Sequence, residues 1–169
     1  MTRFSVSREV RAPAGELWDL LVDWPRHAAW VPFTTMSVDA EGSNTVGSTF
    51  VGRTSVGPVA FDDVMRVVAW RPPEGSTTGR VRVVREGRVL GGSAEVEVRP
   101  VTAERCVATW WEDIELLPGL SPALARLVGL AAAPATVLAG RLLFGRLLRR
   151  AADQAEQAHA ITRAERERP

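Results

Sequence analysis

The run SPALARLVGLAAAPATVLAGRLLFGRLLRRAADQAEQAHAITR, from Ser121 to Arg163, is the segment that decides the fold. Counted from Val137, one side of a helix collects the apolar residues Phe144, Leu147, Leu148, Ala151, Ala155 and Ala158. The opposite side collects Arg146, Arg149, Arg150, Asp153, Glu156 and Gln157. Pro134 disfavours helix through the residue before it, so we expect a separate short helix upstream of it. The pattern predicts one long amphipathic helix that needs a surface to cover.

The chain before Ser121 supplies that surface, because most of it has the pattern of β-strands. Residues 3–11 alternate polar and apolar side chains, Pro13 opens a short helix, and Asp23 is a suitable N-cap for a second one ending at Trp30. Six further segments lie between turn residues: 33–40, 47–55, 59–70, 80–85, 89–99 and 106–116. Short turns predict an antiparallel meander, and alternation predicts one covered face.

Three segments resemble the START-like helix-grip superfamily (SRPBCC), which includes pollen allergens, polyketide cyclases and lipid-transfer domains. They are FSVSREVRAPAGELWDLLVDWPRHAAWVP (4–32), VMRVVAWRPPEG (64–75) and ATWWEDIELLPG (108–119). The resemblance implies an α+β helix-grip fold, with a curved antiparallel seven-stranded sheet and two short helices after the first strand. It also implies a long C-terminal helix over the concave face. We expect one domain over residues 1–163 and a charged tail over 164–169.

Composition excludes several classes of function. The net charge is +1, which does not favour nucleic-acid binding, and the chain has no lysine and no tyrosine. Schiff-base chemistry and tyrosine acid–base catalysis are therefore excluded. The single cysteine and the lack of a leader-like N-terminus predict a cytoplasmic protein. The uncharged run Leu127 to Gly140 is too short to span a bilayer, and no metal-ligand or nucleotide-binding spacing occurs, so no cofactor is expected.

In the resembled fold the sheet and the helix enclose an apolar cavity, and large side chains are candidates for its lining. These candidates are Trp30, Phe33, Phe50, Phe61, Met65, Trp110 and Phe144. Each of them could instead be an ordinary core residue.

Charged residues on apolar faces are more informative than the aromatic ones. Asp63 shares strand parity with Phe61 and Met65, and Arg141 lies among the apolar residues of the helix. Arg53, on the parity of Val51, is a third candidate. A buried charge needs a partner or a ligand, although a bulge could turn Asp63 outward and Arg141 could extend past the helix edge.

Other titratable residues have simpler interpretations. His27 is expected to cap or pack, Cys106 to be an inert buried thiol, and the acidic cluster Glu112, Asp113 and Glu115 to form a solvated rim. The sequence therefore favours binding of a hydrophobic small molecule, such as a lipid or polyketide-like compound. The alternatives are a polyketide aromatase/cyclase, and a module that binds a partner or dimerises through Leu127 to Gly140.

Overall fold

The computed structural model describes residues 2–38, 45–116, 122–166 and 168. Its elements follow the predicted order of one strand, two short helices, six strands and a long helix. They are β1 (Thr2–Val10), α1 (Ala14–Leu21), the 3-10 helix η1 (Trp24–Ala29), β2 (Thr34–Val38), β3 (Thr49–Val56), β4 (Val59–Arg71), β5 (Gly79–Glu86), β6 (Leu90–Thr102), β7 (Arg105–Leu116) and α2 (Pro122–Arg166). The predicted helix-grip fold is confirmed.

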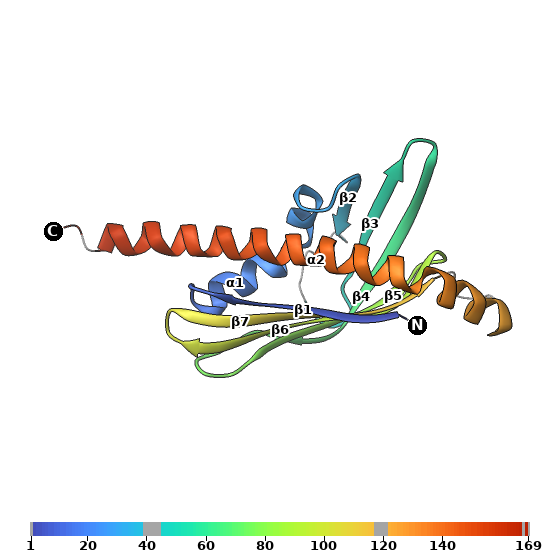
Figure 1. Cartoon of the computed structure of the whole chain (residues 1–169). Coiled ribbons are helices and arrows are strands. Elements are labelled where there is room, and N and C mark those ends of the chain that lie inside the picture. Colours follow the sequence, from blue (N-terminus) through green and yellow to red (C-terminus); the bar gives the residue numbers. More distant parts are fainter. Residues whose placement is uncertain (1, 39–44, 117–121, 167, 169) are drawn as a thin grey trace.

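The seven strands form one antiparallel sheet in the order β1-β7-β6-β5-β4-β3-β2. Strands β2 to β7 are sequential neighbours, as the short turns predicted, and β1 closes the far side against β7. Figure 1 shows β1, β7 and β6 passing beneath α2, while the β3–β4 hairpin rises beside it. The sheet thus curves around the helix.

The two short helices begin and end where the sequence indicated. Pro13 precedes α1, and Leu17, Trp18 and Leu21 of that helix are buried. The side chain of Asp23 accepts a hydrogen bond from the backbone N–H of Arg26, which confirms it as the N-cap of η1. Both helices therefore present apolar side chains to the sheet interior.

Helix α2 differs from the prediction at both of its ends. It is continuous from Pro122 to Arg166 with Pro134 inside, so the expected separate helix before Pro134 is wrong. A proline removes one backbone hydrogen bond and bends a helix without necessarily ending it, and Figure 1 shows the first turns (brown) directed away from the axis of the rest. The helix also continues into the expected 164–169 tail.

The apolar stripe of α2 packs on the sheet as the periodicity predicted. Leu147, Leu148, Ala151 and Ala155 are all buried, and the small alanines let the helix lie close to β1 and α1. Ala158 of the same predicted stripe is exposed, because α2 extends beyond the sheet at its C-terminal end (Figure 1). The central part of the helix therefore anchors it, and the preceding turns cover the space described next.

Candidate functional site

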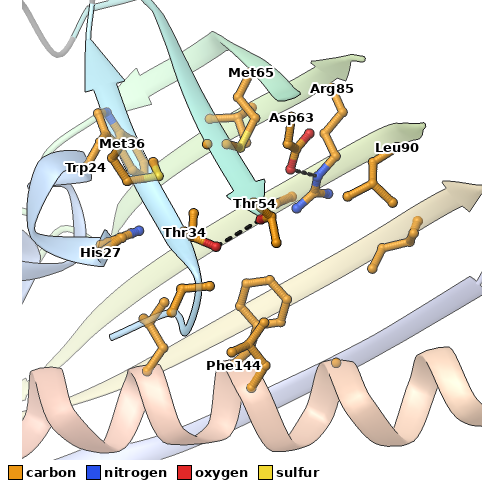
Figure 2. Close-up of a pocket in the computed structure, with 18 of the residues that line it drawn as sticks. Trp24, His27, Thr34, Met36, Thr54, Asp63, Met65, Arg85, Leu90 and Phe144 are labelled. Carbon is orange, nitrogen blue, oxygen red and sulfur yellow. Dashed lines mark hydrogen bonds and ion pairs between the residues drawn. The ribbon is translucent and has the colours of Figure 1, made fainter. Parts of the chain in front are cut away.

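A cavity of about 460 Å³ lies between α2 and the curved sheet. That volume is within the range of small-molecule sites, about 300–1,000 Å³. Figure 2 shows Phe144 extending from α2 toward the strands that form the opposite wall. Most of the side chains around the cavity are apolar: Trp24, Val31, Pro32, Met36, Phe50, Phe61, Met65, Val83, Leu90, Ala94, Trp110, Ile114, Ala139, Leu143, Phe144 and Leu147.

One part of the lining is aromatic and comes from η1 and the strands next to it. The rings of Trp24 and Phe50 are stacked at 4.3 Å, and His27 packs against Trp24, Trp30 and Trp110. The Nε2 atom of His27 donates a hydrogen bond to the Leu21 carbonyl at 3.1 Å. Burial lowers the pKa of His27 to about 4, so the ring is neutral at neutral pH. This region offers flat apolar surface without a charge.

Two charged residues of the lining, Asp63 and Arg85, form a cluster with Glu112, which is not itself part of the lining. The Nε atom of Arg85 donates to Asp63 Oδ2 at 3.1 Å, and its Nη1 atom donates to Glu112 Oε2 at 2.7 Å. The Nε1 atom of Trp110 donates to the other Glu112 oxygen at 2.7 Å. The side chains of Arg85, Asp63 and Glu112 are only 6%, 13% and 0% exposed, respectively. In Figure 2 Asp63 and Arg85 lie side by side, on the opposite side of the view from Trp24 and His27.

Strand register explains how three distant residues meet. Met65 on β4 is paired with Arg85 on β5, so Asp63, two residues before Met65, is a diagonal neighbour of Arg85 on the same face. Glu112 on β7 is paired with Ala94 on β6, and Arg85 is paired with Gly92 on that same strand. Because β6 has only small residues at these two positions, the guanidinium can reach across it to the carboxylate.

Gly92 is required at its position for a further reason. Its φ is 101°, and a Cβ there would collide with the backbone of Asp113. Position 92 of β6, beside the cluster, must therefore remain a glycine.

The cluster has one cation for two carboxylates. Burial raises the pKa of Asp63 and of Glu112, and Arg85 partly opposes both shifts. Burial disfavours the charge of Arg85, but Glu112 and Asp63 together raise its pKa above the ordinary value, so it stays protonated. Asp63 Oδ1 is buried and has no hydrogen-bond partner among the described residues. With both acids ionised, the cluster as a whole has an excess negative charge.

Six of the residues predicted to line a cavity do lie in its wall: Phe50, Phe61, Asp63, Met65, Trp110 and Phe144. Asp63 faces inward because the register shift in β4 lies between Val67 and Ala69, beyond the segment that holds Asp63. The strand parity on which its prediction rested is therefore intact.

The other four predicted residues lie outside the lining. Arg53 points to the outer face of β3 and pairs with Asp62, because Gly52 and Thr54 take the inward positions. Trp30 is buried, but it follows η1 and stacks on His27 in the core behind the cavity. These two placements correct the sequence-based expectation.

Phe33 and Arg141 need the same correction. Phe33 is 72% exposed and has a φ of 60°, an uncommon conformation for a bulky residue, which directs it away from the core. Arg141 is exposed and borders a separate surface depression that includes Arg3 and Asp113. It follows Gly140, which does line the cavity, and one helical residue turns a side chain by about 100°.

The sequence prediction missed Arg85 and misassigned Glu112. Glu112 is fully buried and paired, so the expected solvated rim is wrong for this residue. Strand parity holds the missing signal: Arg85 alternates in phase with Val81 and Val83, and Glu112 with Ala108 and Trp110. Polar residues at inward positions of two separate strands would have indicated a buried pair.

The remaining candidate groups are accounted for within the described residues. Cys106 is buried, and burial raises its pKa to about 11, as expected for an inert thiol. No group of three or more potential metal ligands occurs in the part of the chain that the structure describes. Across the same residues, no helix is apolar enough over sufficient length to cross a membrane. The side chains of residues 127–132 lie outside the described part, so dimerisation through Leu127 to Gly140 stays a prediction.

Solved structures with the same fold include several of known family. The ZhuI aromatase/cyclase from Streptomyces sp. R1128 is 19% identical, with 88% of this chain and 92% of that chain covered and a TM-score of 0.58. The di-domain aromatase/cyclase StfQ from the steffimycin biosynthetic pathway is 15% identical, with 93% of this chain and 51% of that chain covered and a TM-score of 0.69. A START superfamily protein from Mycobacterium smegmatis is 18% identical, with 83% and 97% covered and a TM-score of 0.54.

The comparison of sequences identifies the family. No curated protein matches this chain. The profile of the family described as "Polyketide cyclase / dehydrase and lipid transport" matches residues 1–156, which include all seven strands and most of α2. The chain therefore belongs to the polyketide cyclase / dehydrase and lipid transport family.

Proposed function

We propose that this protein binds a hydrophobic small molecule in the cavity between α2 and the sheet. The observation that supports the proposal is the cavity itself, about 460 Å³ with a mostly apolar lining. Burying about 200 Å² of apolar ligand surface at about 25 cal/mol per Å² contributes about 5 kcal/mol before association costs. A lipid-like or aromatic compound can thus bind with few polar contacts.

The experiment is a titration with the uncharged fluorescent probe phenylnaphthylamine, whose emission rises in apolar surroundings. Ala139 lies in the cavity lining on α2 and is solvent-exposed, so it marks a place where the cavity opens. Ala139→Trp should obstruct the opening and weaken probe binding by about tenfold or more, equivalent to about 1.4 kcal/mol.

The matched control is Leu138→Trp. Leu138 is the preceding residue on the same helix, is 62% exposed and does not line the cavity. The Leu138→Trp variant should therefore bind the probe as tightly as the parent does. Saturable binding that Ala139→Trp weakens and Leu138→Trp preserves supports the proposal. Absence of binding to the parent, or equal binding by both variants, contradicts it.

A second candidate function is that of a polyketide aromatase/cyclase, and the Asp63–Arg85–Glu112 cluster favours it. Such a reaction removes a proton from a methylene carbon, joins that carbon to a carbonyl carbon and then eliminates water. Asp63, which borders the cavity and whose pKa is raised by burial, could exchange the proton. Arg141, a candidate ligand-facing cation from the sequence, is exposed and is not among the residues that line the cavity.

Product analysis separates the two candidates. Incubated with a poly-β-ketone supplied by a minimal polyketide synthase, a cyclase should shift the products toward one cyclised compound. Asp63→Asn should then abolish that shift while phenylnaphthylamine still binds. A product distribution identical with and without the parent protein would leave binding as the function.

A further inference from the structure

The charged cluster constrains the polar end of the ligand. Asp63 and Arg85 both border the cavity, whereas the other member, Glu112, has both oxygens engaged by Arg85 and Trp110. Two of the N–H groups of Arg85 are directed to carboxylates. The arginine is thus already compensated, and it is not a free cation awaiting an anionic ligand.

Asp63 is in the opposite situation. It receives one hydrogen bond, from Arg85 to Oδ2, while Oδ1 is buried and has no partner among the residues described. An unsatisfied buried acceptor is costly, so a donor brought by a ligand has more to gain here than at a satisfied group. The cluster also has one carboxylate more than it has cations, which repels a second anion and attracts a donor.

We infer that the ligand is an apolar molecule with a hydrogen-bond donor, an alcohol or phenol hydroxyl, that binds at Asp63, and that the site discriminates against carboxylates. The inference rests on the proposed function and names the chemical class that the same cavity takes. The rest of the ligand lies along the apolar wall toward Trp24 and Phe50. A free fatty acid is therefore a poorer ligand than the corresponding alcohol.

The test uses three competitors of matched length that displace phenylnaphthylamine: decanol, its isomer methyl nonyl ether, and decanoate. All three share an alkyl chain, but only decanol has a donor, and only decanoate has a charge. The parent should bind decanol about tenfold more tightly than the ether, because a hydrogen bond to an ionised acceptor is among the stronger kinds. Decanoate should be the weakest competitor of the three.

Asp63→Leu removes the acceptor and leaves Arg85 paired with Glu112, so the remaining cluster is neutral. In this variant the preference for decanol over the ether should disappear, and decanoate should improve. The matched control is Asp62→Leu, one residue away on β4, where the exposed carboxylate pairs with Arg53 on the outer face. That variant should keep the ranking of the parent.

The outcomes distinguish the inference from the function on which it rests. The inference is overturned, and the binding function stands, if the parent binds the probe but shows any of three results. These are equal affinity for decanol and the ether, tighter binding of decanoate than of decanol, or a preference for decanol that survives in Asp63→Leu. Failure of the parent to bind the probe at all overturns both. The inference is supported if Asp63→Leu loses the preference for decanol while Asp62→Leu keeps it.

Discussion

Replacing Arg85 with leucine is the most informative perturbation of the cavity wall. The change removes the only cation of the cluster and leaves the buried carboxylates of Asp63 and Glu112 without it. Removing one partner of a buried ion pair costs about 3–5 kcal/mol, because the other charge stays desolvated. Two carboxylates lose their partner here, so the loss should reach at least that range, a large part of a typical stability of about 5–15 kcal/mol.

The assay is urea unfolding followed by tryptophan fluorescence at neutral pH. The matched control is Arg53→Leu, which removes the cation of the Arg53–Asp62 pair, with side chains 57% and 48% exposed. Such surface pairs contribute less than about 1 kcal/mol. Equal losses for Arg85→Leu and Arg53→Leu would refute the description of the cluster as a buried charge network.

The stability lost in Arg85→Leu should depend on pH in a definite direction. Burial already raises the pKa of Asp63 and Glu112, and removing Arg85 raises both values further. An acid whose pKa is higher in the folded state destabilises the fold above that pKa, and the penalty disappears below the unfolded-state pKa. The difference in the free energy of unfolding between Arg85→Leu and the parent should therefore become smaller as pH falls. A difference that is constant or larger in acid would contradict the mechanism.

Replacing the whole cluster tests the same reasoning from the other direction. The triple variant Asp63→Leu, Arg85→Leu and Glu112→Leu leaves no unpaired charge behind. Exchange of a buried ionic cluster for apolar side chains is often neutral or stabilising by about 1–4 kcal/mol. The triple variant should therefore be more stable than Arg85→Leu alone, and a lower stability would show that packing, not charge, governs this region.

Three further predictions concern the rest of the fold. Gly140→Ala should be less stable than Gly145→Ala by about 1–3 kcal/mol in urea unfolding. A Cβ at Gly140 would overlap the ring of Phe4 on β1, whereas nothing lies within 4 Å of a Cβ at Gly145. Equal stabilities of the two variants would disprove the close approach. Leu148→Asp should cost several kcal/mol and Leu142→Asp less than about 0.5 kcal/mol, since the side chains are 1% and 56% exposed; comparable losses would mean that both helix faces are covered. Cys106, whose pKa burial raises to about 11, should resist a thiol reagent at weakly alkaline pH until the protein is unfolded, and rapid reaction of the folded protein would contradict its burial.

The sequence by itself determined the order of the elements and the buried face of several of them. Alternation along a strand and 3.6-residue spacing along a helix are local properties, so they predicted the buried positions of Leu148 and the inward parity of Asp63. The same parity rule, applied to β5 and β7, would have included Arg85 and Glu112.

Only the tertiary structure decided which inward residues meet and which enclose the cavity. The Asp63–Arg85–Glu112 contact depends on the register of four strands and on small residues at Gly92 and Ala94. Sheet curvature and the line along which α2 crosses the sheet are likewise collective, so the spacing could not show that Arg141 falls outside the wall while Gly140 falls inside it. Periodicity specifies a face of one element, whereas a binding site depends on how several faces are placed against one another, and that placement is set by packing between residues distant in the chain.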